Sequence, residues 1–283
     1  APAPARRGPL RGGNAGRWNV TATKRGQLGT ADRFGTSHLL PKDVKWRSAK
    51  LESAITESDR LIIEVLGLDD TAGAAKIFAK LARSPKQPNI EERVIPSLRD
   101  ELGEMVDEAG LPEMALNRVE SWAVALSLAS AQTNNLGLSS KEGVEKKLSA
   151  QVKRLNKPIE GLETIEQQLG YFDKLPEAQQ REMLTSVVEE SGKSKEAFEE
   201  LFNAWITGDN DKLVELSDGG LLESPEMREK ILVARNRDWA EQLDKQLRKP
   251  GTSLVAVGAA HLVGPDAVQT MLEQRGYTIE KIQ

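Results

Sequence analysis

The chain of 283 residues contains no cysteine, which excludes disulfide bonds, thiolate metal ligands and cysteine nucleophiles. No apolar run approaches the roughly 20 residues of a membrane-spanning helix, so we expect no integral membrane segment. The sequence also lacks a phosphate-binding loop, a Gly-x-Ser-x-Gly nucleophile elbow and a His-Glu-x-x-His zinc helix. A serine-hydrolase mechanism therefore has no local motif to support it.

Acidic charge is scarce at one end of the chain. Residues 1–50 carry eleven Lys and Arg against two Asp, whereas the remainder carries 28 basic and 41 acidic residues. The acidic body argues against a nucleic-acid binder, and the basic end could contact an anionic membrane surface or the body itself. Residues 1–16, rich in Pro, Gly, Ala and Arg, are typical of a disordered or loosely docked arm. We expect residues 17–283 to form a single domain.

The first residues, Ala1-Pro-Ala-Pro-Ala, begin without methionine. Such a start is typical of an exported protein whose signal peptide has been removed, although a trimmed chain looks the same. We therefore expect a periplasmic or secreted protein.

Histidine is also rare, and its two occurrences share one pattern. His38 stands in Gly35-Thr-Ser-His38-Leu, and His261 stands in Gly258-Ala-Ala-His261-Leu, each with a proline three or four residues later. Either histidine alone is explained as a structural residue near a helix cap. The matched pair favours two halves of one site, each delivered where a strand ends, which is where open α/β sheets bind ligands.

Short apolar runs rich in β-branched residues predict buried strands, and a run of clean alternation predicts a strand near the end of the chain. These strands cover residues 61–65, 157–163, 253–257 and 277–282. Residues 29–33, GTADR, are too polar to predict a buried strand. A helix over residues 48–58, with Ser48 as its N-cap, precedes the first of them.

Residues 71–217 have mainly helical periodicity, and strand-rich segments flank them. We expect an α/β (α+β) fold in which a central, mostly parallel sheet is built from both chain ends. The helical insertion, about 71–217, is expected to cover the ligand-binding edge.

Two glutamates also end predicted strands: Glu64 closes LIIE and Glu163 closes PIEGLE. Carboxyl ends of parallel strands meet at one edge, so both carboxylates are expected to converge with His38 and His261. Two neutral imidazoles and a carboxylate leave open positions on a divalent ion, and a second carboxylate can act as general base. Each glutamate alone is also explained as a solvated strand end or a helix cap.

A long amphipathic helix is predicted from Pro225 to about Lys249. Asn236 falls within its apolar stripe, where a polar group needs a partner. Its neighbour Arg235 is expected to face a carboxylate or a developing oxyanion, or to form a purely structural ion pair. Glu145, at a predicted helix start, and the hydroxyl groups at 36–37 are weaker candidates.

Several motifs together resemble the TraB/GumN family, which is related to the Tiki proteases. They are FGTSHLLP at 34–41, ESDRLIIE at 57–64, GLETIEQQLGYFDKLP at 161–176, RN-x-x-W at 235–239 and VAVGAAHLVGPDAVQ from 255. The resemblance spans nearly everything after residue 34. It implies a fold similar to ChaN-like haem-uptake and erythromycin-esterase-like proteins.

The resemblance also implies a metal-dependent peptidase. On that basis His38, Glu64 and His261 are the expected metal ligands, and Glu64, Glu163 and Arg235 the expected catalytic or supporting groups. We therefore expect a manganese, cobalt or zinc hydrolase acting on a peptide or protein substrate. The alternative is a binding protein without turnover, which sequesters a peptide or carries haem on a histidine. The aromatic content of 4% offers little to line a haem cleft.

Overall fold

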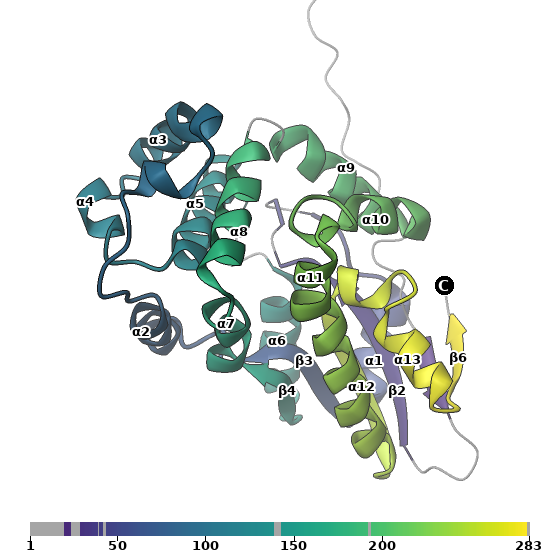
Figure 1. Cartoon of the computed structure of the whole chain (residues 1–283). Coiled ribbons are helices and arrows are strands. Elements are labelled where there is room, and N and C mark those ends of the chain that lie inside the picture. Colours follow the sequence, from purple (N-terminus) through teal and green to yellow (C-terminus); the bar gives the residue numbers. More distant parts are fainter. Residues whose placement is uncertain are drawn as a thin grey trace, which may run out of the picture.

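The computed structural model describes residues 20–23, 29–38, 40–41, 44–138, 143–191 and 194–281. Its centre is a six-stranded sheet with the order β4-β3-β5-β2-β1-β6 (Figure 1). The strands are β1 Val20–Thr23, β2 Gly29–Thr36, β3 Arg60–Leu66, β4 Ile159–Thr164, β5 Gly251–Gly258 and β6 Thr278–Lys281. The predicted arm, residues 1–16, lies outside the described residues.

Four neighbouring strands, β4, β3, β5 and β2, run parallel, and β1 pairs antiparallel with both β2 and β6. The predicted mixed α/β fold, with a largely parallel sheet built from both chain ends, is confirmed. Strand β5 lies between β2 and β3. Its register places Gly258 opposite Thr36 and Ala256 opposite Ile63, so the carboxyl ends of three strands meet.

Strand β2 corrects one expectation from the sequence. The polar segment GTADR, which did not predict a strand, forms the first five residues of β2. The strand has a partner on each side, β5 and β1, and pairing on both edges outweighs weak β-propensity. Arg33 on this strand is only 1% exposed, and no group among the described residues accepts a hydrogen bond from its guanidinium. Burial lowers the pKa of Arg33 to about 10, against the opposing charge of Glu273.

Replacing Arg33 by methionine is expected to stabilise the protein by about 1–3 kcal/mol, because a buried polar group without partners is unfavourable. The midpoint of urea unfolding measures the change. Arg93 supplies the control: it is equally buried but donates to the carbonyls of Pro88, Val119 and Leu116. Arg93→Met should therefore destabilise the protein. A lower midpoint for Arg33→Met would contradict the prediction.

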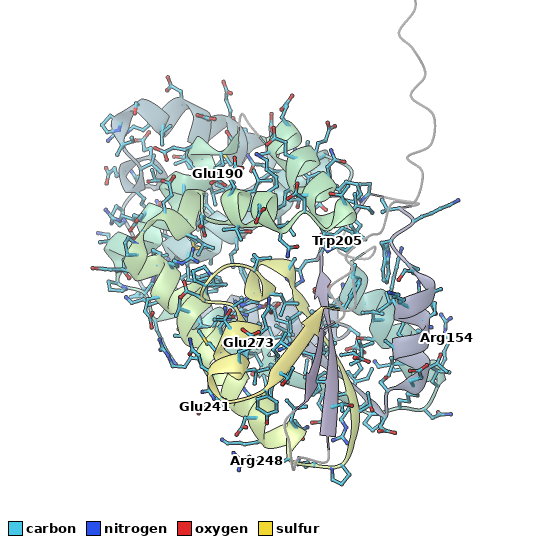
Figure 2. The ribbon with its side chains drawn as sticks, turned by 90° about the vertical axis from the view of Figure 1, so that its right-hand side faces the viewer. Arg154, Glu190, Trp205, Glu241, Arg248 and Glu273 are labelled. Atoms are coloured by element: carbon cyan, nitrogen blue, oxygen red, sulfur yellow. The ribbon has the colours of Figure 1, made fainter. Side chains whose placement is uncertain are left out.

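Helices cover both faces of the sheet. Helices α1 Ala49–Glu57 and α6 Val144–Arg154 lie on one face, and α12 Ala234–Leu247 and α13 Val268–Gln274 lie on the other (Figures 1 and 2). In Figure 2, Arg154 of α6 lies on one side of the sheet, and Glu241 and Glu273 lie on the opposite side. Ser48 caps α1, as predicted, by accepting a hydrogen bond from the Leu51 amide.

The insertion contributes a second, all-helical core beside the sheet. Helices α9 Ser194–Thr207 and α10 Asn210–Ser217 of the insertion pack against the core of the sheet. The second core is formed by α2 Thr71–Leu81, η1 Ile90–Arg93, η2 Pro96–Leu98, α3 Arg99–Glu108, α4 Glu113–Leu116, α5 Ser121–Asn135, α7 Ile165–Asp173 and α8 Glu177–Glu189. Helix α5 is its centre, with Trp122 fully buried between Phe78 and Phe172. No helix in the described ranges has the length and apolarity to cross a bilayer.

Helix α9 connects the insertion to the carboxyl end of the parallel strands. Trp205 donates from its indole nitrogen to the carbonyl of Gly35 at 3.0 Å, and Figure 2 shows it at the tip of the strands. Since Gly35 lies at the end of β2, α9 covers the edge at which β2 stops. The predicted position of the insertion over this edge agrees with the contact.

The predicted helix from Pro225 is interrupted by one wide turn. It consists of α11 Pro225–Arg228, a π-helical turn η5 Glu229–Val233, and α12, preceded by the short turn η4 Gly220–Glu223. Single π turns within α-helices are frequent at functional sites. This turn ends directly before Ala234, so it sets the rotation at which Arg235 and Asn236 face the sheet.

Candidate functional site

Three side chains from distant parts of the chain converge on Gly258 at the end of β5. A Cβ atom built on Gly258 would lie 3.2 Å from Oε2 of Glu64, 3.2 Å from Nε2 of His38 and 3.6 Å from Cδ2 of His261. His38 follows β2 and His261 lies in the turn η6 Ala259–Leu262. The absence of a side chain at Gly258 therefore leaves the space into which the two histidines and Glu64 point.

Glu64 is a buried carboxylate with four neighbours. Its Oε1 accepts from Arg235 at 2.8 Å and from Gln168 at 3.0 Å, and its Oε2 accepts from the Gly258 amide at 3.0 Å. Nε2 of His38 lies 3.6 Å from Oε2. Burial alone would raise the pKa of Glu64, but the histidines, Arg235 and the amide outweigh it and lower the pKa to about 2. Glu64 is therefore ionised at neutral pH.

Arg235 joins the two predicted glutamates. Its Nε and Nη2 each donate at 2.8 Å to the carboxylate of Glu163, and Nη2 also donates to Glu64. Trp239 donates to the same Glu163 carboxylate at 2.8 Å. Burial raises the pKa of Glu163, opposed by these donors, and burial would lower that of Arg235, but the two carboxylates raise it. Arg235 remains a cation that holds both carboxylates in place.

His261 is 6% exposed and has a fixed orientation. The side-chain nitrogen of Asn236 donates to the Asp266 carbonyl at 2.7 Å, which turns the Asn236 oxygen toward Nδ1 of His261 at 2.5 Å. Nδ1 therefore carries the proton, and Nε2 is the unprotonated nitrogen, with Nη1 of Arg235 3.4 Å away. Trp239 packs against the ring at 4.2 Å between centroids. Burial is the main cause that lowers the pKa of His261 to about 3, so the ring is neutral.

His38 differs from His261 in exposure and charge. Its side chain is 53% exposed, and its Nδ1 lies 2.8 Å from Oε1 of Glu145. Thr36 also donates to this oxygen. Burial of part of the ring would lower the pKa of His38, but the charge and hydrogen bond of Glu145, with the charge of Glu64, raise it to about 9. His38 is therefore the accessible member of the pair.

The donor set matches a metal centre in chemistry but is not closed into one. Two ligands about 2.1 Å from an ion at a tetrahedral angle are about 3.4 Å apart, close to the 3.6 Å between His38 and Glu64. Across the described ranges, however, no three His, Asp or Glu side chains are placed so that they could hold an ion. In addition, Nη1 of Arg235 lies 3.4 Å from Nε2 of His261, the nitrogen that an ion would have to bind.

Residues 33–281 match the family model described as the TraB/PrgY/gumN family. The chain belongs to this family. Among curated proteins, the chain is similar to the "Uncharacterized protein YbaP" of Escherichia coli (strain K12). It is 24% identical over 242 residues, which are 84% of this chain and 86% of the relative. The protein of the same name from Shigella flexneri matches to the same extent.

No solved structure gives a significant match. The comparisons therefore establish membership of the TraB/PrgY/gumN family, and they name no reaction for it.

The structure brings together all five site residues predicted from the sequence of this TraB/PrgY/gumN protein. His38, Glu64 and His261 surround Gly258, and Arg235 bonds Glu64 and Glu163. Arg235 does form the structural ion pair that the sequence left as an alternative, because it donates to both oxygens of Glu163. Its Nη1 nevertheless faces His261.

Two residues of the site were missed or undervalued. Glu145 is only a weak candidate in the sequence, yet it binds Nδ1 of His38 and so orients the ring. The sequence predicts that Glu145 lies at a helix start, but not that this helix, α6, lies beside the end of β2. Gln168 was not predicted at all. The signal that could have found it is its place in the first turns of α7, directly after β4, from which a side chain reaches Glu64.

The stability of the metal-free protein is expected to be greatest near pH 6.5. His261 and Glu64 have folded pKa values of about 3 and about 2, below their usual 6.5 and 4.5, so acidification protonates the unfolded chain first and lowers stability below pH 6.5. His38 has a folded pKa of about 9, so its contribution is complete below pH 6.5 and is lost as pH rises toward 9.

Chemical denaturation at pH 4, 6.5 and 9 after chelator treatment measures these changes. The alkaline decline should be the shallower one, because water screens the half-exposed His38. His38→Gln should remove the alkaline decline. Stability that rises from pH 6.5 to 9 in the unmodified protein would contradict the assignment.

Proposed function

We propose that this protein is a divalent-metal-dependent hydrolase that cleaves a peptide bond or a similar acyl bond. The observation that carries the proposal is the matched environment of the two histidines. Each ring has Nδ1 bound to an oxygen acceptor, Glu145 for His38 and Asn236 for His261, and each presents its other edge to the space beside Gly258. Metal-binding histidines characteristically have their second nitrogen bound in this way.

In this proposal His38, Glu64 and His261 hold the ion. When bound, a manganese, cobalt or zinc ion would acidify a water molecule and polarise the scissile carbonyl. Binding needs a neutral His38, and it needs Nη1 of Arg235 to move off Nε2 of His261. Because the guanidinium is planar and rigid, Nη1 can move only if the whole group tilts on the Glu163 carboxylate, to which Nε and Nη2 donate.

The remaining residues position and stabilise the reacting groups. Glu163 accepts three hydrogen bonds from Arg235 and Trp239, so we assign it to positioning Arg235 and not to accepting a proton from water. Nη1 of Arg235 is the donor available to a developing oxyanion. In the overall reaction, the water oxygen bonds to the acyl carbon, the carbon–nitrogen bond breaks and the leaving amine takes up a proton.

A binding protein without turnover is the second candidate. The observation that favours it is the position of Arg235, which neutralises Glu64 and faces His261 as the structure stands. Such a site would hold a carboxylate or amide of a sequestered peptide. Haem held between the two histidines is disfavoured by geometry, because the space between their rings is that of a single Cβ atom at Gly258.

Metal analysis and a peptide-library assay on the same preparation test the proposal. Protein purified without chelator should contain about one divalent ion per chain, and hydrolysis should stop on chelation and return with manganese, cobalt or zinc. An absorbance scan for a Soret band identifies haem. Peptide binding without hydrolysis under any of the three metals would overturn the proposal in favour of the second candidate.

A further inference from the structure

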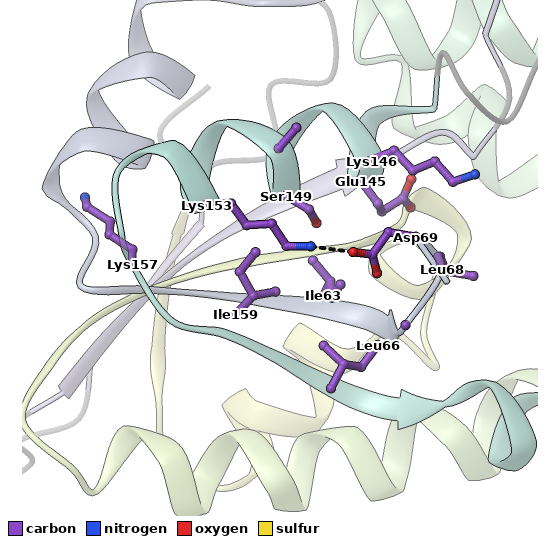
Figure 3. Close-up of a pocket in the computed structure, with 12 residues that line it drawn as sticks. Ile63, Leu66, Leu68, Asp69, Glu145, Lys146, Ser149, Lys153, Lys157 and Ile159 are labelled. Carbon is purple, nitrogen blue, oxygen red and sulfur yellow. Dashed lines mark hydrogen bonds and ion pairs between the residues drawn. The ribbon is translucent and has the colours of Figure 1, made fainter. Parts of the chain in front are cut away.

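A cavity of about 460 Å³ lies beside the candidate site, between α6, the strands β3 and β4, and the turn after β3 (Figure 3). Its volume falls within the range of small-molecule and side-chain pockets. Glu145 lines it and also binds His38 at 2.8 Å. Glu145 therefore belongs both to the lining of the cavity and to the two-histidine site, so the two lie side by side.

The floor of this cavity is aliphatic. Ile63 of β3 and Ile159 of β4 lie on the side that faces α6, and Leu66 lines the cavity at the end of β3 (Figure 3). Leu66 is 44% exposed, which is unusual among the large apolar residues of this chain. A ligand with an aliphatic side chain would remove this surface from water, which favours binding in proportion to the area buried.

The rim of the cavity is basic. Lys146, Lys153 and Lys157 line it, with Asp69 and Glu145 as the acidic residues. The ammonium of Lys157 donates hydrogen bonds to the carbonyls of Ile55, Thr56 and Ser58. Lys146 has no partner among the described residues. Three lysines against two carboxylates leave one excess positive charge at the opening.

An exposed ion pair closes this opening. Lys153 of α6 bonds Asp69 of the turn after β3, and Figure 3 shows the pair reaching across the cavity. Both side chains are more than half exposed, at 56% and 67%, so the pair contributes little stability. A carboxylate on a ligand could replace Asp69 at Lys153 with almost no loss, and it would gain the charge of Lys146.

We propose that this cavity binds the part of an extended peptide substrate next to the cleaved bond, with an aliphatic side chain on Ile63, Leu66 and Ile159 and a carboxylate at Lys153 and Lys146. The inference rests on the proposed function, since it names the substrate class of the same site. An extended chain advances about 3.3 Å per residue with side chains alternating in direction. The aliphatic and acidic residues are therefore expected two positions apart, on the same side of the peptide.

Equilibrium binding of labelled peptides to chelator-treated protein tests this without turnover. The first probe is fluorescein-Gly-Gly-Leu-Gly-Glu-Gly-amide, the second has Gln in place of Glu, and the third has Ser in place of Leu. A fourth has Gln and a free terminal carboxylate. Fluorescence anisotropy should give about 10-fold weaker binding for the second and third probes. Tight binding of the fourth would assign the carboxylate to a chain end, and weak binding would assign it to a side chain.

Substitutions of Lys153 and Asp69, the ion pair at the cavity opening, test whether the carboxylate of the peptide binds there. Lys153→Met should weaken the first probe about 10-fold and leave the second unchanged, whereas Asp69→Asn should tighten the first probe several-fold. Lys212→Met is the matched control, because Lys212 also forms an exposed pair with a glutamate, Glu215, on another helix; it should change neither probe.

Equal binding of the first and second probes, or an unchanged first probe in Lys153→Met, would overturn the inference. These outcomes are independent of the proposed function, which fails if no peptide is hydrolysed under any metal. Selective binding without hydrolysis would keep the cavity assignment and reject only the reaction. Hydrolysis without selective binding would keep the proposed reaction and reject the cavity assignment.

Discussion

Arg235→Met is expected to destabilise the protein by about 3–5 kcal/mol, the range observed when one partner of a buried ion pair is removed. Arg235 is 5% exposed, and its guanidinium donates to both Glu163 and Glu64. Without it, two buried carboxylates face each other with no cation between them. Urea denaturation at pH 7 measures the loss.

The matched control lies two positions along the same helix. Arg237 also pairs with a glutamate, Glu229, but both side chains are more than half exposed, so Arg237→Met should change stability by less than about 1 kcal/mol. Adding Glu163→Gln to Arg235→Met should recover part of the loss, because one of the uncompensated charges disappears. Equal effects of the two arginine substitutions would show that the buried network is open to water.

His261→Ala is expected to lower hydrolysis by more than about 100-fold, because even groups one step removed from a metal ligand commonly change affinity or activity 10- to 100-fold. The stability loss should be about 1–3 kcal/mol, since the ring loses its hydrogen bond to Asn236 and its packing on Trp239. The alanines that flank His261 in the sequence give no sign of its packing on Trp239. Turnover and bound metal should be measured on the same samples.

His38→Ala is expected to separate the effect of the histidine pair on activity from its effect on stability. It should lose activity to the same extent but less stability, because His38 is half exposed. The double variant should be scarcely less active than either single one, as residues that act as a unit are non-additive. If His261→Ala kept full turnover with the best metal, the two-histidine centre would be wrong and the repeated Gly-x-x-His pattern structural.

The parts of the fold that could be predicted are those with local signals. The apolar run at 253–257, the Ser48 cap and Pro225 each act over a few residues, and β5, α1 and α11 begin or lie where they indicate. Strand β2 could not be predicted, because its stability comes from pairing with β5 and β1 and not from its own residues. The π turn at 229–233 has no proline or glycine to mark it.

Some residues of the candidate site could likewise be predicted from local sequence patterns, whereas others depend on tertiary packing. The histidine pair repeats a visible motif, and both glutamates end apolar runs, so their convergence followed from parallel pairing alone. Asn236 could be singled out as a polar residue in an apolar stripe, but its action on the His261 tautomer needs the Asp266 carbonyl. The role of Glu145 depends on α6 crossing the end of β2, which is a matter of tertiary packing.

The position of β5 between β2 and β3 has a consequence for the time course of folding. Residues that meet across β5 are far apart in sequence: Thr30 and Thr252 are 222 positions apart, and Glu64 and the Gly258 amide are 194 apart. On a ribosome, β2 and β3 therefore emerge long before the strand that joins them, each with an exposed edge open to aggregation. Such long-range pairing slows folding. The helical core around Trp122 can form in the meantime, whereas His38 and Glu64 meet only after β5 has been synthesised and inserted.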